Sequence, residues 1–118
     1  MKESGCMKVF ELQPLRFPAG WTVRYNAFSE YDPEKDSAEY SYELQEDLLQ
    51  LANKNLLIDL GWYPNGDIDG SYKLFLVDMN RDRPFDMPLE SFCSKSKQEV
   101  IYKIEYWTNY GFFSKYLR

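Results

Sequence analysis

The fold is decided by one stretch of the sequence, Asn55-Leu-Leu-Ile-Asp-Leu-Gly-Trp-Tyr-Pro-Asn-Gly-Asp-Ile-Asp-Gly-Ser-Tyr-Lys-Leu-Phe-Leu-Val-Asp78. Its first half alternates with period two, as a β-strand does. One face of this strand carries Leu56, Ile58, Leu60 and Trp62. The middle, 64–71, consists mostly of residues that favour turns. In the second half, 72–77, both faces are largely apolar. The stretch therefore predicts a β-hairpin whose second strand lies inside a sheet with cover on both sides.

Before the hairpin, the sequence predicts an extended lead-in, a strand and a helix. The lead-in covers Lys8 to Leu12, and the strand covers Trp21 to Phe28. The strand should present Trp21, Val23, Tyr25 and Ala27 on one face. After a polar loop, a helix is expected from Ser37 or Glu39 to Asn53. Its apolar stripe would be Leu44, Leu48, Leu51 and Ala52.

After the hairpin, the sequence predicts an edge segment, a second helix and a packed tail. Residues 85–92 are expected to form a short edge strand, because Pro88 is incompatible with a central one. Ser96 and Glu99 form a capping box that opens a helix ending near Tyr110, with Gly111 as its stop. The aromatic tail, 112–118, should pack back on the body. These elements predict one α+β domain over 1–118, a mainly antiparallel β-sheet with two helices packed on it. Residues 1–7 are expected to be a disordered leader.

Composition and charge exclude several classes of function. The net charge of −5 argues against nucleic-acid binding, which needs a basic face. The absence of histidine removes the commonest general base and transition-metal ligand. Cys6 and Cys93 lie too far apart in the sequence to form a zinc motif, and they are expected to be free, reduced thiols. The first residues contain no apolar core typical of a signal peptide, and no apolar run is long enough to span a membrane, so we expect a cytoplasmic protein without membrane contact. We also expect no metal and no cofactor.

The hairpin loop is the first candidate site. Asn65, Asp67 and Asp69 stand at positions one, three and five of a calcium-binding pattern, with Gly70 at six. Position twelve is Leu76, where a bidentate glutamate is required, and strands rather than helices flank the loop. Turn formation explains the same residues. A calcium or small-molecule site in 65–70 therefore stands only as an alternative function.

Carboxylates near the hairpin are the second candidate, as an acid–base pair for hydrolysis. The residues are Asp59, Asp67, Asp69 and Asp78. Nothing in the sequence shows that any two converge, and 19 acidic residues among 118 make some proximity inevitable. We therefore expect that the protein is not an enzyme.

The charge pattern supplies the third candidate, which we call the acidic segment, residues 30–47. It holds eight acids and one base, a net charge of −7, so the rest of the chain carries +2. The acids are Glu30, Asp32, Glu34, Asp36, Glu39, Glu43, Glu46 and Asp47, and the interleaved tyrosines are Tyr31, Tyr40 and Tyr42. Acidic side chains around aromatic anchors suit docking to a basic protein surface. A solvated surface of the protein would account for the same residues.

Four stretches of the chain together resemble small bacterial immunity proteins that accompany polymorphic or contact-dependent toxins. They are Gly20-Trp-Thr-Val-Arg-Tyr-Asn-Ala-Phe28, Glu46-Asp-Leu-Leu49, Ile58-Asp-Leu-Gly-Trp-Tyr-Pro64 with Gly66-Asp-Ile-Asp-Gly-Ser-Tyr72, and Glu99-Val100 with Ile104-Glu-Tyr-Trp107. The resemblance spans about residues 20–107 and brings no catalytic motif.

This resemblance implies a protein that binds a cognate toxin and blocks it, often with an acidic surface. The partner-binding residues would be those of the acidic segment, with Asn65, Asp67 and Asp69 as a second contact edge. The protein would act as a monomer or a homodimer. A further alternative is an oligomeric regulatory module that uses the aromatic tail, Phe112 to Tyr116, as its interface.

Overall fold

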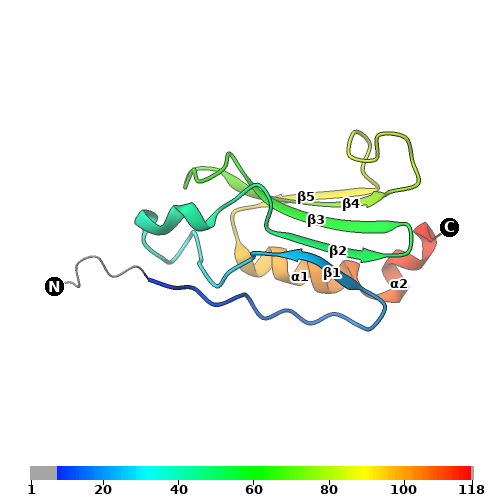
Figure 1. Ribbon diagram of the computed structural model, residues 1–118, viewed down its shortest axis with the longest axis horizontal. Coiled ribbons are helices and arrows are strands. Elements are labelled where there is room, and N and C mark those ends of the chain that lie inside the picture. The colour runs from blue at the N-terminus through cyan, green and yellow to red at the C-terminus, as the bar shows by residue number, and fades with distance from the viewer. Residues whose placement is uncertain (1–7, 118) are drawn as a thin grey trace.

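The sheet has five antiparallel strands in simple sequential order (Figure 1). The computed structural model of the protein describes residues 8–117, so the predicted leader, 1–7, lies outside the described residues. The strands are β1 (Thr22–Asn26), β2 (Leu49–Asn53), β3 (Leu56–Tyr63), β4 (Ser71–Asp78) and β5 (Glu90–Ser94). The helices are the 3-10 turns η1 (Ala38–Glu43) and η2 (Ser114–Tyr116) with α1 (Lys97–Trp107) and α2 (Tyr110–Phe113). The predicted α+β class with a mainly antiparallel sheet is confirmed.

The central hairpin is confirmed as β3 and β4. Eight residue pairs join the two strands, from Leu56 with Asp78 to Tyr63 with Ser71. β3 is buried along nearly its whole length, but Ser71, Lys73 and Phe75 on the outer face of β4 are only half-buried. The prediction of cover on both sides of the second strand is therefore wrong, because the helices pack on one face of the sheet. The difference between the two faces fixes this register, because a slip by one residue would turn Asp59 and Lys73 toward the core and the leucines away from it.

The helix predicted from Ser37 or Glu39 to Asn53 is wrong. Only Ala38–Glu43 is helical, as the 3-10 turn η1, and Leu49–Asn53 is strand β2. The predicted stripe residues Leu44, Leu48 and Leu51 are all buried, but strand β2 buries Leu51 by pairing with β1 and β3. Two neighbours in the sheet satisfy the backbone of β2, and this tertiary pairing outweighs the helical preference of Glu, Gln and Leu.

Strand β1 departs from the predicted alternation at a bulge. Val23 pairs with Leu51, but the register shifts and Tyr25 pairs with Gln50. Paired residues point to the same side of a sheet, so Val23 lies on the side of Leu51 and Tyr25 on the opposite side. The prediction that Trp21, Val23, Tyr25 and Ala27 share one face is therefore wrong.

The C-terminal third matches the prediction in type and differs in detail. Ser96 begins α1 and accepts a hydrogen bond from the Glu99 amide at 3.2 Å, as the capping box predicts. The Glu99 carboxylate accepts a bond from the Ser94 hydroxyl at 2.6 Å. The predicted edge segment 85–92 becomes β5, which begins after Pro88. The prediction of Gly111 as the helix stop is wrong, because α1 ends at Trp107 with Thr108 as its cap, and Gly111 lies inside α2. The tail packs back, with Phe113 buried against Trp21 at 5.1 Å between ring centroids.

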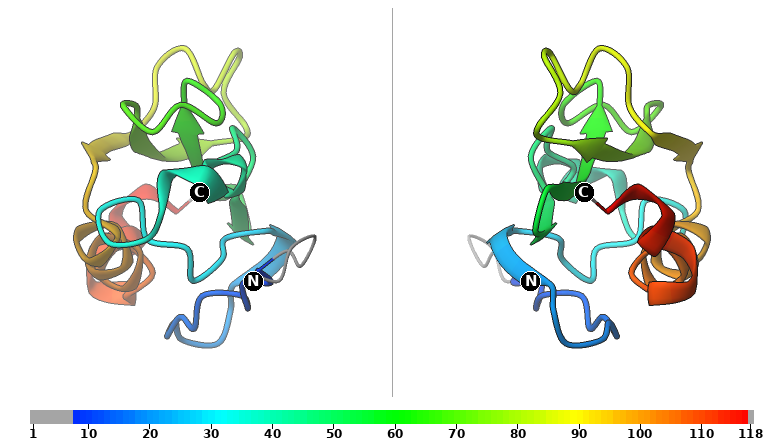
Figure 2. Two further views of the ribbon diagram at one scale, coloured as in Figure 1. Left: turned by 90° about the vertical axis from the view of Figure 1, so that its left-hand side faces the viewer. Right: turned by 90° about the vertical axis from the view of Figure 1, so that its right-hand side faces the viewer.

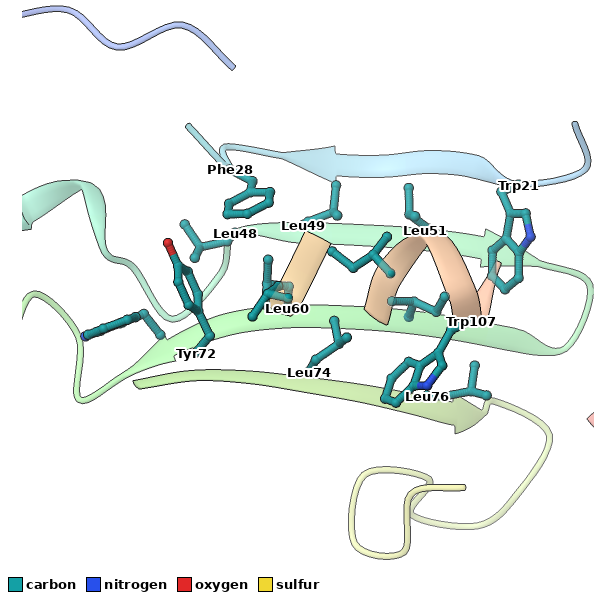
Figure 3. Packing of buried hydrophobic residues seen from close by; sticks show 14 of the residues in the cluster. Trp21, Phe28, Leu48, Leu49, Leu51, Leu60, Tyr72, Leu74, Leu76 and Trp107 are labelled. Carbon is teal, nitrogen blue, oxygen red and sulfur yellow. The ribbon is translucent and has the colours of Figure 1, made fainter. Parts of the chain in front are cut away.

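The hydrophobic core lies between the sheet and the C-terminal helices. Figure 2 shows α1 and α2 on one side of the sheet. Figure 3 shows side chains of β2, β3 and β4 pointing toward α1, together with Trp21 and Phe28 that flank β1. Trp107 comes from α1 to meet them. Within residues 8–117, no helix is long and apolar enough to cross a bilayer.

Candidate protein-binding surface

The acidic segment joins β1 to β2 at one end of the sheet. Figure 1 shows η1 at the same end of the molecule as the β3–β4 loop. Two hydrogen bonds fasten the segment to this loop. The Glu46 amide donates to Oδ1 of Asn65 at 2.7 Å, and the Gly66 amide donates to the carbonyl of Leu44 at 2.6 Å. The predicted second contact edge and the acidic segment therefore adjoin.

Buried side chains hold the acidic segment against the body. Tyr31, Leu44 and Leu48 are each at most 2% exposed. The Tyr31 hydroxyl donates to the Ser37 carbonyl at 3.0 Å, and burial followed by the charges of Asp36 and Asp32 raises its pKa. Well-packed core residues occupy defined positions, so these anchors fix where the segment runs along the body of the protein.

Local hydrogen bonds shape the loop between Tyr31 and η1. Oδ1 of Asp32 accepts from the Glu34 amide at 2.9 Å, and Oδ2 of Asp36 accepts from the Asp32 amide at 2.8 Å. Ser37 caps η1 by accepting from the Glu39 amide at 3.3 Å. Aspartate and serine commonly close turns in this way. Asp32 and Asp36 therefore help to fold the loop, in addition to carrying charge.

The structure separates the predicted contact residues by exposure. Exposed residues are Glu30, Glu34, Glu39, Tyr42, Glu46 and Asp47, together with Asn65, Asp67 and Asp69 of the second edge. Half-buried residues are Asp32, Asp36, Tyr40 and Glu43. The prediction of Tyr31 as a contact residue is wrong, because its side chain is 1% exposed and belongs to the core.

The carboxylates of the acidic segment have no basic partner in the described chain. The salt bridge between Arg83 and Asp86, at 3.2 Å, is the one ion pair among residues 8–117. Lys97 lies behind the segment, 3% exposed, and its ammonium donates to the carbonyl of Ser29 and, at 3.1 Å, to Oε1 of Gln13. Burial lowers the pKa of Lys97 to about 8, against the opposing influence of Asp32 and other acids. Five acids of the segment are thus exposed and form no ion pair with a described residue: Glu30, Glu34, Glu39, Glu46 and Asp47.

In the described structure, the loop residues 65–70 do not form a set of calcium ligands. Oδ1 of Asn65 accepts from the Glu46 amide, and Oδ1 of Asp67 accepts from the Asp69 amide at 2.9 Å. Among residues 8–117, no group of three or more Asp, Glu, Cys or His side chains is placed to hold a metal ion. Asp59 and Asp78 do not form an acid–base pair, because the register places them on opposite faces of the sheet.

A second group of polar residues lies on the sheet face opposite α1. The sequence points to Asp59 as a candidate carboxylate, but not to Gln50, which strand pairing brings beside it. Asp59 is 9% exposed and accepts a hydrogen bond from Nε2 of Gln50 at 2.9 Å. Burial raises the pKa of Asp59. The hydrogen bond from Gln50 lowers this pKa, and the negative charge of Asp47 raises it further. Burial also raises the pKa of Tyr63, with further contributions from Asp59, Glu46 and Asp47. The group joins the end of the acidic segment to the sheet.

Replacing the buried carboxylate, in Asp59→Asn, is expected to stabilise the free protein by about 1 kcal/mol at pH 7.5. Asparagine keeps an acceptor for Gln50 and removes a buried charge. A raised folded-state pKa destabilises the wild type at higher pH, so the advantage of asparagine is full above that pKa. It fades as the pH falls toward the unfolded pKa. Thermal melts at pH 7.5 and pH 4 measure the difference.

The matched control is Asp69→Asn, which alters an exposed carboxylate of the β3–β4 loop. Its effect should stay within about 0.5 kcal/mol at both pH values. A destabilising Asp59→Asn at pH 7.5 would mean that the Asp59 charge is better satisfied than its surroundings indicate.

No family model, curated protein or solved structure matches this chain.

Proposed function

We propose that this protein is a non-enzymatic binding protein of the immunity type, which acts in the bacterial cytoplasm and neutralises a cognate toxin by covering it. The observation that carries the proposal is the acidic segment. It concentrates a net charge of −7 in 18 residues, and no described lysine or arginine lies within 4 Å of its carboxylates. A surface of this kind favours a basic partner.

Electrostatics supports fast and selective capture. Unpaired surface carboxylates of one sign attract a basic protein over about 8 Å at physiological ionic strength. Speed matters to an inhibitor of a toxin, because the toxin must be captured before it reaches its target. Glu34 and Glu39 are exposed between the buried anchors Tyr31 and Leu44, and the exposed Glu30 directly precedes Tyr31.

Rigidity supports tight binding. A preorganised surface loses less conformational entropy on association than a flexible loop does. The segment is anchored at Tyr31, Leu44 and Leu48 and is tied to the β3–β4 loop through Asn65 and Gly66. These contacts use a part of the hairpin that also carries the family resemblance, so the same residues build the fold and hold the surface in place.

The alternative of an oligomeric module that uses the aromatic tail has less support. Phe113 is buried, and Phe112 and Tyr116 pack against the core of the same chain. These rings therefore have an intramolecular role.

The proposal is tested by co-expressing the chain in a bacterial host with the toxin domain encoded beside its gene. We expect growth to be restored and the two proteins to purify as a stoichiometric complex. A toxic neighbour whose toxicity the chain leaves unchanged, or one that it does not bind, would contradict the proposal.

A further inference from the structure

We propose that a cavity on the sheet face opposite α1, lined by Tyr25, Asp47 and Gln50, receives an arginine side chain of a basic protein partner. The inference rests on the proposed function, since it names the anchor point of that interface. The cavity has a volume of about 290 Å³. This is at the lower limit of pockets for small molecules, and it suits a single side chain.

The bulge in β1 creates the wall of this cavity. Without the register shift, Tyr25 would point to the side of Leu51. With the shift, it pairs with Gln50 and is 46% exposed on the other face. Bulges commonly redirect a side chain toward a functional surface. An aromatic ring beside a carboxylate, here Tyr25 beside Asp47, is a favourable surface for a guanidinium group, which stacks on rings and donates hydrogen bonds in its plane.

Asp59 supplies the second, independent observation. It is 9% exposed, and its one side-chain hydrogen bond in the described chain comes from Gln50, whose side chain also lines the cavity. No described lysine or arginine lies within 4 Å of its carboxylate. A buried carboxylate with a single neutral donor is poorly satisfied, and a cation brought by a partner would satisfy it. Gln50 thus connects this carboxylate to the cavity.

The neighbouring cation is engaged elsewhere. Lys73 projects on the same face as Asp59, and its ammonium lies 5.7 Å from the centre of the Tyr63 ring. It forms no ion pair within 4 Å among the described residues. Among residues 8–117, the carboxylates of Asp47 and Asp59 therefore have no cation within ion-pair distance.

Position connects the cavity to the acidic segment. Asp47 is the last residue of that segment and also a wall of the cavity. A basic protein attracted by the segment would thus lie beside a pocket for one of its side chains. Buried arginine anchors beside a broader charged surface are a common arrangement in tight interfaces.

The test is a titration of the full chain, labelled with ¹⁵N, with N-acetyl-L-arginine amide, followed by NMR. N-acetyl-L-citrulline amide is the control probe, because it has nearly the same shape and no charge. We expect the arginine probe to shift the side-chain amide of Gln50 and the backbone amides of Tyr25 and Asp59, with a dissociation constant of about 1–10 mM. The citrulline probe should cause little change at the same concentrations.

The Asp47→Asn/Asp59→Asn variant should weaken the arginine probe about tenfold, whereas Asp82→Asn/Asp86→Asn, at the other end of the molecule, should leave its affinity unchanged. Equal shifts from both probes, or shifts spread over the acidic segment without Gln50, would overturn the proposal. If the arginine probe does not bind but the protein still neutralises the toxin, the arginine pocket is refuted and the proposed function stands. If the arginine probe binds but the protein does not neutralise the toxin, the proposed function is refuted and the arginine pocket stands.

Discussion

Gly61→Ala is expected to lower the free energy of unfolding by about 3 kcal/mol, one of the two largest effects in this protein. A Cβ at position 61 would lie 2.0 Å from the carbonyl oxygen of Glu46 and 2.9 Å from Cε2 of Tyr63. The first contact is with backbone, so a side-chain rotation cannot relieve it. Chemical denaturation of both proteins measures the change.

The same clash would also disturb the end of the acidic segment, because residues 45–48 run beside β3 next to Gly61. The Trp62 amide donates to the carbonyl of Gln45 at 2.8 Å, and the Leu48 amide donates to the carbonyl of Leu60 at 3.0 Å. Glycine at 61 lets the end of the acidic segment approach β3 this closely. The variant should therefore loosen residues 45–48 along with the fold.

Gly66→Ala is the matched control. Gly66 has a φ of +73° and no atom within 4 Å of an added Cβ, so its replacement brings backbone strain of about 1 kcal/mol without a clash. Equal losses of stability in the two variants would show that steric contact with Glu46 is not the reason for glycine at 61.

Glu34→Lys/Glu39→Lys is expected to weaken binding of the cognate toxin about thirtyfold at low salt, which corresponds to about 1 kcal/mol for each reversed charge. Both side chains are exposed on the acidic segment. The loss should appear mainly in the association rate and shrink as salt screens the charges. Surface plasmon resonance at 50 mM and 500 mM NaCl measures both effects.

The matched control reverses two exposed acids at the other end of the molecule, in Asp82→Lys/Asp86→Lys. The change in net charge is the same, and the salt bridge that it breaks, between Arg83 and Asp86, is exposed and contributes little. Similar weakening in both variants would indicate a general charge effect. Unchanged binding in the first variant would remove the acidic segment from the interface.

Local signals account for the parts of the fold that the sequence predicts well. The β3–β4 hairpin combines period-two alternation with a turn-rich loop, and α1 begins at a serine cap three residues before Glu99. The segment that became β2 lacks such a signal. A leucine pattern at 44, 48 and 51 fits one face of a helix, whereas the pairing of Leu51 with Val23 and Ile58 depends on the whole sheet.

Some features of the candidate site are likewise visible in the sequence, and others depend on the fold. The charge of the acidic segment is a property of composition and is visible in the sequence. The burial of Tyr31, the redirection of Tyr25 by a bulge and the contact of Gln50 with Asp59 depend on residues that the fold brings together. Period-two reasoning placed Tyr25 with Trp21 because a bulge of one residue leaves no clear mark in the sequence.

Hydrogen exchange of the full chain, free and in complex with its toxin, tests the central claim most directly. We expect toxin binding to slow exchange in peptides covering 30–47 and in the β3–β4 loop at 65–69. The main competing surface is the outer face of α1 and the start of α2, where Tyr102, Tyr106 and Tyr110 are exposed. Protection confined to that surface, with 30–47 unchanged, would contradict the account.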